Sequence, residues 1–165
     1  MSKSKLLNTY DNAPKIKQIV DNLQTPENKL YLQGLVGSSL SFVINSLFTK
    51  TEKPFLVLFN DKEEAAYYLN DLEQLIGEKD VLFYPGSYRR PYQIEDTDNA
   101  NVLLRAEVLN RINSRKKPAV IVSYPEALFE KVVTKKDLEK NTLKVSVGDK
   151  ISIEFINEVL FEYEF

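Results

Sequence analysis

The chain has 165 residues, a formal net charge of −2, 43% hydrophobic residues and 28% charged residues, a composition typical of a folded globular protein. It contains no cysteine and no histidine, which excludes disulfide bonds, thiolate or imidazole metal ligands and serine–histidine triads. Phosphoryl chemistry using Lys, Asp, Ser and Mg²⁺ is the main catalytic option left. No apolar run approaches the ~20 residues of a transmembrane helix, and Met1–Lys5 does not begin a signal peptide, so we expect a cytoplasmic protein.

Apolar periodicity predicts alternating helices and strands along the first part of the chain. We expect helices over 14–23, 38–50, 61–76, 98–113 and 125–132, and strands over 29–33, 55–59, 81–84 and 119–123. Continuous apolar runs such as Phe55–Phe59 are typical of parallel strands buried on both faces. Asp61 with Glu64 predicts a capping box, and the basic triplet at 115–117 is attributed to the dipole of the helix that it ends. This order predicts a three-layer α/β domain, with a parallel sheet and helices on both faces.

The pattern changes after about Lys136. Residues 142–147 alternate between apolar and polar, as in a strand exposed on one face, and residues 151–161 read as an amphipathic helix. Residues 151–165 carry glutamates and aromatic residues but no lysine or arginine. We therefore expect residues 1–136 to form one domain, and residues 137–165 to be the incomplete start of a small α+β domain.

A segment between a predicted strand and helix has the spacing of a nucleotide-binding P-loop. Its residues are Gly34, Leu35, Val36, Gly37, Ser38, Ser39, Leu40 and Ser41. A working P-loop wraps glycine backbone around the phosphates, places a lysine on their charge and a hydroxyl on Mg²⁺. Here Ser39 replaces the third glycine and Leu40 replaces the lysine, so nothing holds the β- and γ-phosphates. We predict a degenerate, non-functional loop, with no catalytic residues, cofactor or metal; a plain strand–turn–helix with tightly packed glycines is the alternative.

The stretch after the strand at 81–84 combines arginine, tyrosine and proline. Tyr88, Arg89, Arg90 and Tyr92 form a candidate contact loop for nucleic acid or protein, because arginine binds phosphate bidentately and tyrosine stacks on bases. The loop also follows the carboxyl end of a strand, where α/β proteins place ligands. The alternative is a rigid connection whose tyrosines pack on the sheet, and the acidic residues at 95–98 offset the arginine charge.

Taken in order, these segments resemble the N-terminal region of the bacterial transcription-repair coupling factor family. The resemblance is carried by Gly34–Ser39, Phe55–Phe59 with Asp61 and residues 63–65, Leu82–Pro91, Arg105–Leu109, Val120–Leu128 and Leu143–Asp149. It implies a RecA/helicase-like P-loop domain, similar to the excision-repair helicase subunit that verifies damage, in which the ATP site has been lost.

The resemblance further implies a non-catalytic module that acts in transcription-coupled nucleotide excision repair by protein–protein contact. Its expected partners are the excision-repair damage-recognition ATPase and other domains of the parent translocase, against which it packs to hold the parent inactive. The ATP-driven motor that displaces stalled RNA polymerase, the contacts to polymerase and double-stranded DNA, and the family's recruitment residues are expected in other parts of the parent. No membrane partner is expected. A nucleic-acid-binding module using Tyr88–Tyr92 and a working P-loop NTPase remain as alternatives.

Overall fold

A computed structural model describes residues 3–88, 98–115, 117–132, 134, 136 and 145–162. The chain divides into two compact units, Met1–Lys131 and Val132–Phe165, and each is described by itself. No helix in these described ranges is both long and apolar enough to cross a membrane. The predicted division at residue 136 stays a prediction.

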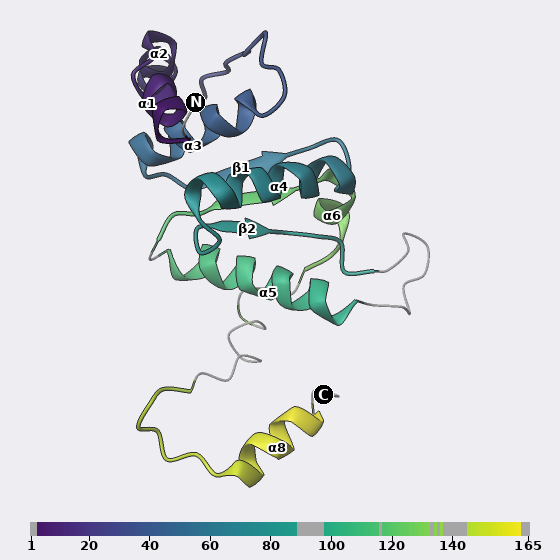
Figure 1. Cartoon of the computed structure of the whole chain (residues 1–165). Coiled ribbons are helices and arrows are strands. Elements are labelled where there is room, and N and C mark those ends of the chain that lie inside the picture. Colours follow the sequence, from purple (N-terminus) through teal and green to yellow (C-terminus); the bar gives the residue numbers. More distant parts are fainter. Residues whose placement is uncertain are drawn as a thin grey trace. The chain divides into compact units, whose positions relative to one another are not determined.

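A small parallel sheet lies at the centre of the first unit (Figure 1). Its strands are β1 (Phe55–Leu58), β2 (Val81–Phe83) and β3 (Val120–Ser123), in the order β1-β3-β2. Leu56 and Leu82 both pair with Ile121, so these side chains point to one face of the sheet, because alternate residues of a strand share a face. All four residues of the central strand β3 are buried, as expected for a parallel strand covered on both sides.

Helices cover both faces of this sheet (Figure 1). The helices of the first unit are α1 (Lys3–Asp11), α2 (Pro14–Leu23), α3 (Ser39–Thr51), α4 (Lys62–Ile76), α5 (Asn99–Ser114) and α6 (Pro125–Phe129). Of these, α4 and α5 pack on the sheet, and α1 and α2 pack on α3. The crossovers through α4 and α5 run in opposite directions across the sheet, so the right-handed rule places these helices on opposite faces. Accordingly, Tyr68 of α4 stacks on Phe59 with ring centroids 4.4 Å apart, whereas the Arg105 guanidinium of α5 lies 4.2 Å from the Tyr84 ring centroid. The prediction of an α/β fold with a parallel sheet is confirmed.

The N-terminal helices form a second, smaller core against α3. This core contains Ile16 of α2 and Val43 and Leu47 of α3, all buried. Tyr10 of α1 stacks on Phe42, with the ring centroids 5.0 Å apart. The sequence predicted α2 and α3 but not α1.

The predicted strand at 29–33 is wrong. This segment is irregular, its Tyr31 is 87% exposed, and its backbone forms no hydrogen bond with another described residue. Strand propensity reflects how well a side chain fits a paired, half-buried surface, so an apolar run without a neighbouring strand does not form one. The helix predicted to reach residue 132 also ends earlier, at Phe129.

The second unit contains one described helix, α8 (Ile153–Glu162). Before it, residues 145–150 form a turn in which the Ser146 N–H donates to Asp149 Oδ2 at 2.7 Å and the Asp149 N–H donates to the Ser146 carbonyl at 3.0 Å. The described part of the predicted strand at 142–147 is therefore not a strand, and residues 142–144 lie outside the described residues.

Candidate functional site

The P-loop-like segment turns sharply into α3. Gly34 and Gly37 have φ angles of +85° and +54°, left-handed conformations that glycine adopts without strain. Ser38 is the N-cap residue of α3, and its side chain forms no capping hydrogen bond. The loop therefore keeps the sharp turn of its sequence pattern.

The side chains that would serve a phosphate group point toward the protein instead. Ser39 Oγ accepts a hydrogen bond from the Val36 N–H at 2.7 Å. This N–H is therefore already bonded within the loop and is not free to bind a phosphate. Leu40, at the lysine position, is half-buried and packs against the main core. Ser41 is fully buried, and its hydroxyl donates to Asp71 Oδ2 of α4 at 3.3 Å. An anion would meet mainly backbone N–H groups at the start of α3.

The first acidic residue after β1, Asp61, has a structural role. Asp61 is the N-cap residue of α4, and its Oδ1 accepts a hydrogen bond from the Glu64 N–H at 2.7 Å. The capping role predicted for Asp61 is confirmed. Among the described residues, no cluster of three or more acidic groups is arranged to hold a metal ion.

The second predicted site, the contact loop, is described only at its two ends. Arg89, Arg90 and Tyr92 lie outside the described residues, and Tyr88 is half-buried. The Asp98 N–H donates to the Ser87 carbonyl at 2.8 Å, which joins the backbone on either side of the loop. Asp98 also caps α5, because its Oδ1 accepts from the Ala100 N–H at 3.0 Å.

A buried ion pair lies under the first half of this loop. Arg105 of α5 is only 6% exposed, and its Nη1 is 3.4 Å from Oε2 of Glu130, which follows α6. The same nitrogen donates to the carbonyls of Pro85 at 2.7 Å and Ala127 at 3.0 Å. The guanidinium also faces the Tyr84 ring, a cation–π contact. Arg105 thus connects α5, α6 and the end of β2, although its Nη2 has no hydrogen-bond partner among the described residues.

Glu130 and Tyr124 hold the loop backbone directly. The Glu130 carboxylate accepts from the Ser87 N–H at 2.8 Å and from Ser87 Oγ at 2.6 Å. Tyr124 Oη accepts from the Gly86 N–H at 2.9 Å. A Cβ built on Gly86 would lie 2.7 Å from Glu130 Oε1, so the close approach of the loop to this carboxylate requires glycine.

Burial keeps the two phenols of this network in their neutral form. Burial raises the pKa of Tyr84, an effect that the Arg105 charge opposes. Burial also raises the pKa of Tyr124, and the hydrogen bond from the Gly86 N–H partly offsets this rise. Both phenols therefore stay protonated at neutral pH, where they pack and accept hydrogen bonds.

The sequence patterns did not identify this Arg105–Glu130 network. One signal was available, because Arg105 and Val108 fall on the same buried stripe of α5, and a charged residue on such a stripe is usually paired. Its partner Glu130, however, lies on a different element, and only the fold brings the two together.

Comparison with known proteins places these features in a family context. No family model matches the sequence. The chain is 25% identical over 136 residues to the transcription-repair-coupling factor of Bacillus subtilis, covering 82% of this chain and 11% of that protein. It is 33% identical over 92 residues to UvrABC system protein B of Cytophaga hutchinsonii, covering 56% of this chain and 14% of that protein.

A further UvrABC system protein B, from Leptospira biflexa serovar Patoc, is 25% identical over 154 residues, covering 86% of this chain and 23% of that protein. The chain thus spans less than a quarter of the length of each of these three relatives. Transcription-repair-coupling factor and UvrABC system protein B are therefore homologues of this chain, as its ordered motifs predicted.

Proposed function

We propose that this chain is a non-catalytic protein-contact module of nucleotide excision repair. Its homology to transcription-repair-coupling factor and UvrABC system protein B supports the pathway. The observation that carries the non-catalytic role is the inward direction of Leu40 and Ser41, the residues at the lysine and hydroxyl positions of the loop. As part of a longer repair protein, the module would recruit the excision-repair damage-recognition ATPase and pack against the parent translocase to hold it inactive.

The missing positive charge at position 40 supports the non-catalytic role, in addition to the inward direction of the Leu40 and Ser41 side chains. In phosphoryl transfer the lysine of the loop and a hydroxyl-bound Mg²⁺ neutralise charge on the transferred group. Leu40 supplies no charge, and the Ser41 hydroxyl is engaged by Asp71 in a fully buried position. A chain without histidine also lacks the side chain that most often acts as general base.

The loop that contains Tyr88–Tyr92 is a suitable surface for the proposed protein–protein contact. Its base is held by Glu130 and Tyr124, and its two ends are joined by the hydrogen bond between Asp98 and Ser87. A surface whose base is fixed in the free protein loses less conformational freedom on binding, which favours affinity. We propose that this loop adds a partner contact of its own, separate from the recruitment residues expected in other parts of the parent.

The first test is a calorimetric titration of the chain with Mg-ATP, with Leu40→Lys as a parallel sample. We expect neither protein to bind ATP at submillimolar concentration. Residue 40 packs on the core, so a lysine there would not reach a phosphate bound at the loop. Burying its ammonium group should instead lower the free energy of unfolding by about 1–3 kcal/mol. A working P-loop NTPase serves as the positive control, and submillimolar binding by the native sequence would reopen the NTPase alternative.

The second test measures binding of the chain to the purified damage-recognition ATPase by biolayer interferometry. We expect the double substitution Arg89→Ala/Arg90→Ala to weaken binding about tenfold or more, since arginines at interfaces often carry most of the affinity. The matched control is Lys15→Ala/Lys17→Ala, at exposed positions of α2. Equal loss in the two variants, or no binding by the native chain, would contradict the proposal. Strong, salt-dependent DNA binding that needs Arg89 and Arg90 would favour the nucleic-acid alternative.

A further inference from the structure

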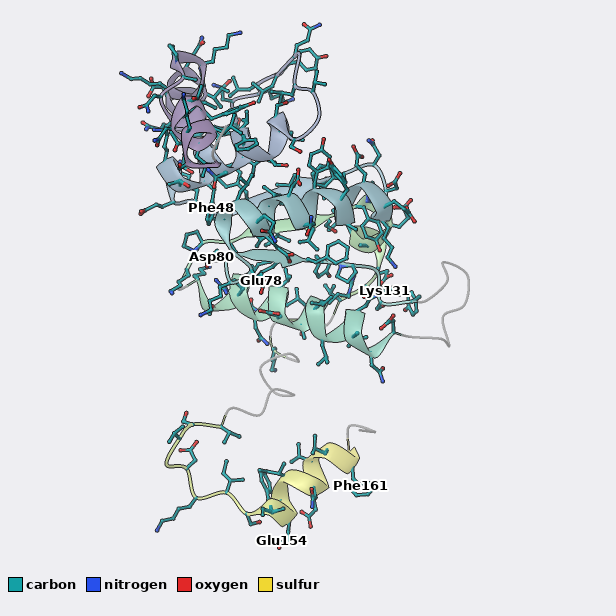
Figure 2. All side chains as sticks on the ribbon, in the orientation of Figure 1. Phe48, Glu78, Asp80, Lys131, Glu154 and Phe161 are labelled. Atoms are coloured by element: carbon teal, nitrogen blue, oxygen red, sulfur yellow. The ribbon has the colours of Figure 1, made fainter. Side chains whose placement is uncertain are left out.

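A groove lies at the amino ends of the strands, away from the contact loop. Two adjoining clefts of about 380 and 540 Å³ form it, and they share Glu52, Lys117 and Pro118. Phe48 and Asp80, which line the larger cleft, lie at this end of the first unit, and Lys131 lies at the other (Figure 2). We call these two clefts the amino-end groove.

The smaller cleft has an apolar floor that continues onto the open face of the sheet. Pro54 and Ile112 line it together with Ile121 of the central strand. Ile121 is the register partner of Leu56, and Leu58 lies on the same face as Leu56 because alternate residues of a strand share a face. Leu56 and Leu58 are 57% and 50% exposed, so the β1 side of this face is uncovered by the described residues. Exposed apolar surface of this kind marks a place where another molecule packs.

The rim of the smaller cleft is positively charged. Among the described residues that line it, Arg111, Arg115 and Lys117 are cationic and Glu52 is acidic. Arg111 is committed to Asp80, with its Nη1 3.5 Å from Oδ1. Arg115 and Lys117 are exposed and form no ion pair with another described residue. Two cations of the rim are therefore available to a partner.

The helix dipole accounts for only part of this charge. Arg111 lies in the last turn of α5, where a cation is favourable, but the effect fades beyond that turn, and Lys117 lies past the helix end at Ser114. Arg115 occupies the residue after α5 with φ +49°, a left-handed position where glycine is usual and other residues cost roughly 1 kcal/mol. Residues held in strained backbone conformations are concentrated at functional sites, which favours a functional role for the Arg115 charge.

We propose that the amino-end groove binds an acidic amphipathic segment of a partner protein. The apolar side chains of the segment pack on the surface formed by Ile112, Ile121 and Leu56, and its carboxylates face Arg115 and Lys117, the helix-in-groove mode of recognition. Charge complementarity favours the acidic partner. The described lining of the smaller cleft holds no aromatic ring for base stacking, which favours a peptide over a nucleic acid.

The test is a fluorescence anisotropy titration of the whole chain against a fluorescein-labelled helical peptide with leucines on one face and glutamates on the other. We expect saturable binding that Arg115→Glu/Lys117→Glu weakens about tenfold or more, through lost attraction and added repulsion. Ile112→Asn should also weaken it, through the apolar floor. The control Lys15→Glu/Lys17→Glu makes the same charge change on exposed positions of α2 outside the groove and should leave affinity within about twofold.

Three outcomes would overturn the proposal. They are absence of saturable binding, equal binding by the groove variant and the native chain, and preference of the groove for a single-stranded oligonucleotide over the peptide. A peptide with lysines in place of the glutamates should not bind. Because the groove and the loop containing Tyr88–Tyr92 are tested with different variants and different probes, failure here leaves the proposed role of that loop in place.

Discussion

Replacing Glu130 by leucine is expected to lower the free energy of unfolding by about 3–5 kcal/mol, the cost of leaving a buried charge without its partner. Arg105 is 6% exposed, and Glu130 is the carboxylate that pairs with it. The substitution also removes the acceptor of the Ser87 N–H and hydroxyl. Urea denaturation followed by circular dichroism measures the loss as a lower midpoint.

The double variant Arg105→Met/Glu130→Leu distinguishes the cost of an unpaired buried charge from the contribution of the ion pair itself to stability. Removing both partners of a buried ion pair costs much less than removing one, and is sometimes neutral, so we expect the double variant to regain at least half of the lost stability. Glu126→Leu is the matched control, since Glu126 is exposed in the first turn of α6 and should change stability by less than about 0.5 kcal/mol. A double variant as unstable as Glu130→Leu would mean that the loop contacts, and not the charge pair, dominate.

Replacing Leu72 by alanine is expected to lower the free energy of unfolding by about 2–5 kcal/mol. Leu72 of α4 is fully buried in the main core, between the helix and the sheet. The smaller side chain forfeits apolar burial and leaves a cavity that close-packed neighbours fill only in part.

Leu103→Ala provides the comparison for this core substitution. Leu103 lies on α5 and is 58% exposed, so the same chemical change should alter the urea midpoint little, by about 0.5 kcal/mol or less. Similar losses for the two substitutions would contradict the assigned core, and would place Leu103 under a covering that the described residues do not supply.

The sequence predicted the elements whose signals are local. The capping side chain of Asp61 and the apolar run at 55–59 depend on neighbours along the chain, and both were found as predicted, with β1 ending at Leu58. The sequence also places Leu40 where the P-loop pattern calls for lysine, whereas the loss of nucleotide binding that this substitution implies stays a prediction. Similarity to transcription-repair-coupling factor followed from the order of such motifs.

Tertiary structure decided everything that depends on distant partners. Residues 29–33 have the composition of a strand but no strand to pair with, and pairing, not propensity, makes a strand. Arg105 lies on α5 and Glu130 directly follows α6, so their ion pair exists only after these two segments pack. The amino-end groove likewise joins the ends of α3 and α5 to β3. Sequence thus determined the local elements and the side chain offered at each loop position, and the fold alone decided which side chains meet, because burial and pairing are set by contacts between segments far apart along the chain.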